Sequence, residues 1–92
     1  MFDYTGWIVR SAAGHDKGDL MCVIGTQEDR LLLADGKRRK IAAPKHKKLG
    51  HVSVLNRGSF EHATIRKIQS GEVVTDRMLR AALAAFRDEL EV

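Results

Sequence analysis

The sequence predicts a small, mainly β domain with a helical C-terminus, and three observations support this. Up to about residue 55, apolar residues occur in short runs of strand length, separated by glycine-bearing or polar turns. From Thr75 onward, the apolar spacing becomes that of an amphipathic helix. The chain has 92 residues, the length of one domain. We therefore expect a β-barrel or sandwich over residues 1–58 and a helical extension over residues 59–92, both within one compact domain.

Five strands are predicted, joined by short connections. The loop between the first two has Gly14 and Gly18 at its ends, where glycine accommodates a positive φ. Residues 26–29 are a plausible hairpin connection between the second and third strands. Asp35-Gly36 is a two-residue hairpin signal between the third and fourth. The predicted strands cover residues 6–11, 19–25, 30–35, 38–42 and 51–55.

Two helices are predicted in the C-terminal part of the chain. Thr75 is a suitable N-cap for the longer one, and Asp76 favours the positive end of the helix dipole. A shorter helix over residues 61–70 would use Ile65 and Ile68 as its apolar anchors. One face of the longer helix carries an apolar stripe made of Leu79, Ala82, Leu83, Phe86 and Leu90.

The composition excludes several classes of protein. With 43% hydrophobic and 30% charged residues, the chain is typical of a folded domain and not of a disordered tail. A chain this short builds a modest core, which argues against a deep cleft for a large cofactor. No apolar run approaches the roughly 20 residues that span a bilayer, and the first ten residues lack the layout of a secretory signal. Because the single cysteine, Cys22, has no partner for an internal disulfide, we expect a cytoplasmic location.

Positive charge is concentrated in one segment. The chain has 16 Lys+Arg against 12 Asp+Glu, a net charge of +4 with histidine neutral. Residues 37–48 hold seven of the cations and no acid, so the rest of the chain has nine cations against 12 acids, a net of −3. A local field of this kind is typical of proteins that bind polyanions. The candidate RNA contacts in this segment are Lys37, Arg38, Arg39, Lys40, Lys45, His46, Lys47 and Lys48.

The predicted fourth strand would display part of this charge. Strand alternation places Arg38 and Lys40 on one face and Lys37 and Arg39 on the other, and Pro44 would end the strand before a basic loop. The alternative is a solvated edge whose charges prevent strand-to-strand aggregation. Edge protection requires one or two lysines. Seven cations without a balancing acid therefore favour contact with nucleic acid.

The loop bounded by Gly14 and Gly18 is a second candidate phosphate site, with Lys17 at its tip. Backbone amides in such a turn can approach a phosphate closely. The GxxxxGK[ST] pattern and the following helix of a nucleotide-binding P-loop are both absent. The alternative is an ordinary tight hairpin turn with polar residues.

Several of these residues together resemble a KOW motif, the short strand–loop–strand unit of several ribosomal proteins and transcription elongation factors. They are Val9, Gly14, Lys17-Gly18 and the apolar residues 22–24. The chain more closely resembles small bacterial KOW-domain RNA-binding proteins, which are similar to a group of archaeal and eukaryotic large-subunit ribosomal proteins. The likeness runs from about residue 5 to residue 90 and is carried by VRSAAGHDKGDLMCVIG (9–25), LLLADGKRRK (31–40), PKHKKLGHV (44–52) and TDRMLRAAL (75–83).

This resemblance implies an SH3-like five-stranded barrel that binds structured RNA in a ribosomal context. By position, Lys17 and the cations of residues 37–48 would contact the phosphate backbone. The family often has arginine where this chain has His15, and a neutral histidine weakens the loop as a phosphate site at pH 7. Gly50 stands where a basic residue is common in the family. Further candidate contacts are Arg10, His15 and His51.

Other chemistries have weaker support in the sequence. Tyr4 and Trp7 could stack on unpaired bases, but Trp7 precedes a strand and is expected to be partly buried. No CxxC or HxxxH pair occurs and Cys22 is expected to point into the core, so no metal site is predicted. No nucleophile or acid–base pair has a recognisable catalytic spacing. We therefore expect no catalytic residue, cofactor, small-molecule substrate or membrane partner.

A second function class stays open at this point. The apolar face of the C-terminal helix, with Leu83 and Phe86, could pack on the barrel or on another protein. If the helix packs on another protein, the chain is a protein-interaction adaptor with a ribosomal or transcription protein partner, and the basic segment has a secondary role in its function. The exposed face of this helix mixes Arg77, Arg80 and Arg87 with acids, so it is not predicted to be an RNA-binding helix.

Overall fold

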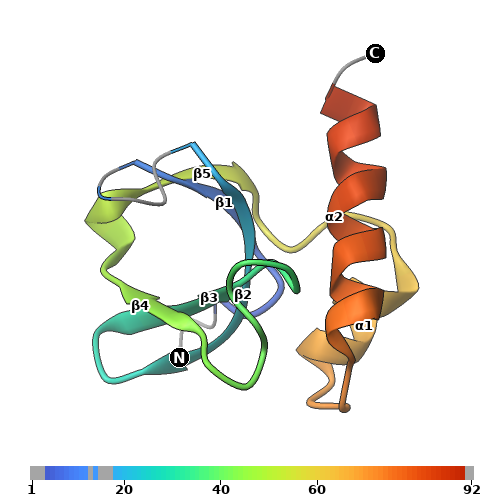
Figure 1. The fold of residues 1–92 in the computed structure, drawn as a ribbon, viewed down its shortest axis with the longest axis horizontal. Coiled ribbons are helices and arrows are strands. Elements are labelled where there is room, and N and C mark those ends of the chain that lie inside the picture. Colours follow the sequence, from blue (N-terminus) through green and yellow to red (C-terminus); the bar gives the residue numbers. More distant parts are fainter. Residues whose placement is uncertain (1–3, 13, 15–17, 91–92) are drawn as a thin grey trace.

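The computed structural model describes residues 4–12, 14 and 18–90, which form a five-stranded antiparallel sheet followed by two helices (Figure 1). The strands lie side by side in the order β4-β3-β2-β1-β5. This confirms the predicted class, mainly β with a C-terminal α-helical part. The elements are β1 (Ile8–Ser11), β2 (Leu20–Gln27), β3 (Arg30–Ala34), β4 (Lys45–Lys47), the 3-10 helix η1 (Leu49–His51), β5 (Val52–Asn56), α1 (Ala63–Gln69) and α2 (Asp76–Leu90).

Both faces of the sheet are covered by apolar side chains. Successive residues of a strand point to opposite faces, and β1 accordingly contributes Ile8 to one cluster and Val9 to another. In β2, Cys22 belongs to the first cluster and Met21 to the second. Figure 1 shows a strongly curved sheet with α2 standing beside it. The first cluster lies between the sheet and the helices, and the second lies on the opposite face.

The second cluster contains Trp7, which is only 7% exposed, as predicted. Tyr4 packs on it edge-to-face, with ring centroids 4.8 Å apart and an interplanar angle of 76°. The guanidinium carbon of Arg57 lies 5.6 Å from the Trp7 ring centroid, within the range of a cation–π contact. The tryptophan therefore stabilises the sheet and is not available as a platform for bases.

The apolar face of α2 is covered by the chain's own sheet. Leu79, Leu83 and Phe86 are buried in the same cluster as Ile8 and Leu20. The predicted N-cap is confirmed, since the Met78 amide donates to Thr75 Oγ1 over 3.1 Å. The predicted shorter helix is also present as α1, which buries its two isoleucines. Neither helix in the described part of the chain has the length and apolar character that a membrane-spanning segment needs.

The fourth strand lies at a different place from the one predicted. Residues 36–39 form bends and residues 41–42 a turn, so the prediction of a strand over residues 38–42 is wrong. The strand β4 instead occupies Lys45–Lys47, which was expected to be a loop, and it pairs antiparallel with β3. Most of the basic segment is therefore an irregular loop, and its end is a sheet edge.

Turn chemistry at Asp35 explains this difference. Its Oδ1 accepts hydrogen bonds from the backbone amides of Lys37 and Arg39, over 2.8 and 2.9 Å. The Asp35 and Gly36 amides both donate to the Arg39 carbonyl oxygen. An aspartate that bonds its own backbone offers the chain an alternative to strand pairing. The predicted two-residue hairpin at Asp35-Gly36 is thus a closed loop over residues 35–39, whereas the predicted hairpin between β2 and β3 is present.

Candidate nucleic-acid interface

The loop over residues 35–39 carries cations at its surface. Lys37 and Arg38 are exposed and Arg39 is half-buried, and Lys40, directly after the loop, is exposed as well. The Arg38 side chain is 71% exposed and pairs with Asp19, with Nη1 3.7 Å from Oδ2. Only the arginine side of this pair is well solvated, because Asp19 Oδ2 is buried and accepts no hydrogen bond from the described residues. Arg38 has further N–H groups on its guanidinium, so a phosphate oxygen can bind it while the pair with Asp19 stays in place.

The strand β4 divides its cations between two environments. Lys45 and Lys47 pair with Leu33 and Leu31, which belong to the second cluster, so both lysines lie on the face of the sheet that carries this cluster. Lys45 is half-buried and Lys47 only 8% exposed, whereas His46 on the other face is exposed. The expectation that Lys47 lies on an exposed loop is therefore wrong. Its position at the end of a strand makes it part of the folded framework.

Lys47 also connects the basic segment to the first half of the chain. A Cβ built on Gly14 would lie 3.4 Å from Lys47 Nζ, so the ammonium group lies against the first glycine of the loop over residues 14–18. The Ala12 amide donates to the carbonyl oxygen of His51 over 2.9 Å. The N-terminal end of this loop is thus held against β4 and η1.

The C-terminal end of the same loop lies beside two arginines, Arg10 and Arg38. Arg10 Nη1 donates to the Gly18 carbonyl oxygen over 2.8 Å. The next residue is Asp19, the partner of Arg38. The predicted contacts His15 and Lys17 lie between these ends, outside the described residues. The loop over residues 14–18 is thus bracketed by Lys47 at its start and Arg38 at its end.

The exposed cations of residues 37–48 define what we call the basic surface. Lys48 is exposed just before η1, and His51, at the end of η1, is exposed as well. Arg10 is half-buried. Of the predicted contacts, Arg39, Lys45 and Lys47 are set back from the surface. The basic surface consists of Lys37, Arg38, Lys40 and Lys48, with His46 and His51 beside them.

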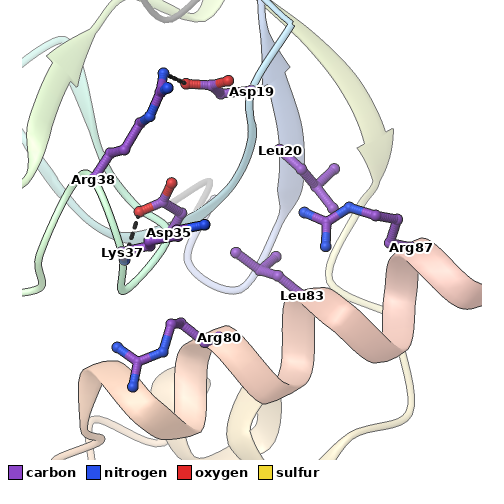
Figure 2. Close-up of a pocket in the computed structure, with 8 residues that line it drawn as sticks. All are labelled: Asp19, Leu20, Asp35, Lys37, Arg38, Arg80, Leu83 and Arg87. Carbon is purple, nitrogen blue, oxygen red and sulfur yellow. Dashed lines mark hydrogen bonds and ion pairs between the residues drawn. The ribbon is translucent and has the colours of Figure 1, made fainter.

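A cavity of about 370 Å³ opens between the loop over residues 35–39, the start of β2 and α2 (Figure 2). Its α2 wall carries Arg80 and Arg87, which were not among the predicted contacts. Their spacing in the sequence could have indicated this position, because residues three before and four after Leu83 lie on the same face of the helix as Leu83. The lining residues are Asp19, Leu20, Asp35, Lys37, Arg38, Arg80, Leu83 and Arg87.

Other reactive side chains are placed in structural roles. Cys22 is fully buried, and the loss of hydration raises the pKa of its thiol to about 12, so it stays protonated at neutral pH. His62 caps α1, with Nδ1 accepting from the Thr64 amide over 3.1 Å. Among residues 4–12, 14 and 18–90, no three His, Cys, Asp or Glu side chains lie close enough together to hold a metal ion.

Comparison with known proteins gives no family. No protein-family model matches the chain, and no curated protein matches it.

Proposed function

We propose that this chain is a non-catalytic, cytoplasmic RNA-binding protein, an SH3-like KOW barrel with a helical extension, and that it contacts structured RNA of the ribosomal kind. The observation that carries the proposal is the bracketing of the loop over residues 14–18 by the basic segment. Lys47 Nζ lies against Gly14 at one end, and Arg38 pairs with Asp19 at the other. Two segments that each suit phosphate, one from each half of the sheet, thereby meet in space.

The exposed cations support binding through the RNA backbone. Lys37, Arg38, Lys40 and Lys48 are all exposed. Each phosphate that such a residue neutralises releases condensed counterions, which makes binding favourable and dependent on salt. Arginine can also bond a phosphate with two parallel N–H groups.

Side chains that read bases are scarce, which favours recognition of RNA by shape. The chain has one asparagine and two glutamines. Asn56 Oδ1 accepts from the backbone amides of residues 58–60, and Gln69 Nε2 donates to the Gly58 carbonyl oxygen, so both stabilise the fold. Because Trp7 is buried as well, few side chains remain that could hydrogen-bond to base edges or stack on bases. Structured RNA, read through its phosphate spacing, fits this inventory better than a single strand.

The adaptor alternative has no comparable support. It requires the apolar face of α2 to be free for a partner, and this face is buried against β1 and β2. Replacing Leu83 or Phe86 would therefore test folding and not an interface.

A salt titration of RNA binding tests the proposal. The probes are a ribosomal RNA fragment, an RNA hairpin and a single strand. The test variant changes the four exposed cations of the basic surface to glutamine, namely Lys37, Arg38, Lys40 and Lys48. The control variant removes the same charge from exposed cations elsewhere, namely Arg30, Arg66, Lys67 and Arg77.

The test variant is expected to bind the hairpin at least about tenfold more weakly, and its log–log salt slope should fall by roughly three, since up to four phosphate contacts are lost. The control variant should retain most of the affinity. Equal losses of affinity in the two variants would mean that overall charge, and not the basic surface, determines binding. Wild-type binding that does not depend on salt concentration would overturn the RNA-binding proposal.

A further inference from the structure

A second group of cations faces the cavity beside α2. Arg80 and Arg87 stand two turns apart on the helix with Leu83 between them, and Figure 2 shows all three side chains on the side that faces the sheet and the loop. Lys37 and Arg38 line the same cavity from the loop over residues 35–39. Two separate elements thus direct four cations toward one cavity.

Two carboxylates line the cavity beside its four cations, which leaves an excess of two positive charges. Asp35 Oδ1 accepts from two backbone amides of its own loop. Asp19 pairs with Arg38, although its buried Oδ2 accepts no hydrogen bond from the described residues. Arg80 uses Nη1 for the Gly36 carbonyl oxygen, over 2.6 Å, which leaves most of its five N–H donors for another group. Within the described residues, the side chains of Lys37 and Arg87 make no hydrogen bond or ion pair. The cavity therefore has unmatched positive charge and unused donors.

The cavity walls are fixed by contacts between the loop and α2. Arg80 holds the Gly36 carbonyl oxygen, and the Ile41 amide donates to Asp76 Oδ1 over 2.8 Å. The backbone at Gly36 lies so close to α2 that a Cβ there would overlap the Asp76 carbonyl oxygen. Because the protein's own contacts hold the walls in place, little ordering is needed when an anion enters.

We propose that this cavity binds a phosphate group of the RNA backbone, so that the RNA path continues from the loop over residues 14–18, past Arg38, onto α2. This inference rests on the proposed function and extends it to a part of the chain where the sequence predicted no RNA contact. Arg38 joins the two regions, because it pairs with Asp19 at the end of that loop and also lines the cavity. The cavity volume of about 370 Å³ lies at the lower end of the range for small-ligand sites.

The experiment compares two single substitutions on the same helix. Arg87→Gln removes a cation from the cavity, and Arg77→Gln removes an exposed cation of α2 that does not line it. Both variants lower the net charge by one, so a difference between them reports position. The probe is a labelled RNA hairpin, titrated by fluorescence anisotropy at several salt concentrations. Arg87→Lys, which keeps the charge but loses the planar fork, is a second variant.

The Arg87→Gln variant is expected to bind about fivefold more weakly, with a salt slope reduced by about one, whereas Arg77→Gln should change the affinity less than about twofold. Arg87→Lys should keep the wild-type slope. Equal affinities of Arg87→Gln and Arg77→Gln would overturn the inference. If the four-cation variant of the basic surface still loses RNA binding in that case, the proposed RNA-binding function is kept and only the inference about the cavity fails. If the wild type binds no RNA, the proposed function and the inference about the cavity both fail.

Discussion

Burial decides what each candidate side chain can do, and the lysines of β4 illustrate this at the scale of single residues. Lys47 belongs by sequence to a basic segment without acids, yet pairing with Leu31 turns it toward the face of the sheet that carries the second cluster. Its neighbours His46 and Lys48 are exposed. Charge along a sequence therefore predicts the location of the basic surface, but only strand pairing shows which of its cations face solvent.

The buried thiol of Cys22 is expected to make the protein less stable as the pH rises above 9. Burial raises the pKa of this thiol from its ordinary value of 9.0 to about 12, so above pH 9 the thiol ionises in the unfolded state before it does so in the folded state. This stabilises the unfolded chain by up to about 1.4 kcal/mol per pH unit between pH 9 and 12. The stability advantage of the wild type over Cys22→Ala should therefore shrink between about pH 8 and about pH 10.5 in urea denaturation. Parallel pH profiles of the two proteins would contradict the burial of the thiol.

Gly36 is the glycine whose replacement should be most damaging to the region of the cavity. Its φ is +79°, and a Cβ would overlap the Asp76 carbonyl oxygen. Gly71 is the matched control, because its φ is +78° but a Cβ there would meet nothing within 4 Å. Gly71→Ala should lose about 1 kcal/mol of stability from backbone strain alone, and Gly36→Ala at least about 2 kcal/mol. Thermal denaturation measures both, and equal losses would argue against the close approach of loop and helix.

At the scale of secondary-structure elements, the local apolar pattern predicted most strands and helices, whereas the turn signal at Asp35-Gly36 predicted a turn but not its closed form over residues 35–39. The strands β1, β2, β3 and β5 and both helices lie close to their predicted positions, because each has a periodic apolar pattern that a single face can bury. The strand β4 has no such pattern, since its sequence is Lys-His-Lys. Its place in the sheet comes from pairing with β3, and pairing with a neighbouring strand leaves no periodic signal in the sequence of β4 itself.

Packing of α2 on the sheet should account for a large part of the stability. Leu83 is 2% exposed within the cluster shared with β1 and β2, whereas Leu90 at the end of the helix is 46% exposed. Leu83→Ala is expected to lower the free energy of unfolding by about 2–5 kcal/mol, because it removes buried methyl groups and leaves a cavity. Leu90→Ala should lower it by less than about 1 kcal/mol. Similar effects in urea denaturation would mean that α2 is not seated on the sheet.

At the scale of the whole molecule, three distant parts of the chain come together around Asp19. It directly follows the loop over residues 14–18, pairs with Arg38 and lines the cavity that Arg80 and Arg87 border. The loop and the basic segment were predictable because each has a local signature of glycines or charge. The spacing of the α2 arginines places them on the helix face of Leu83, but only the packing of the helix on the sheet shows that this face borders the loop over residues 35–39. Tertiary packing thus extends the candidate surface beyond the segments that composition reveals.

Mapping the RNA contact on the protein by NMR would show whether the basic surface is where RNA binds. A uniformly ¹⁵N-labelled protein is titrated with an unlabelled RNA hairpin, and backbone amide shifts are followed. We expect the largest changes at Gly18, Arg38, Lys40 and Lys48, while the amides of α1 stay nearly unchanged. Changes confined to α1, or no changes at RNA concentrations that saturate a micromolar site, would mean that RNA does not bind at the basic surface.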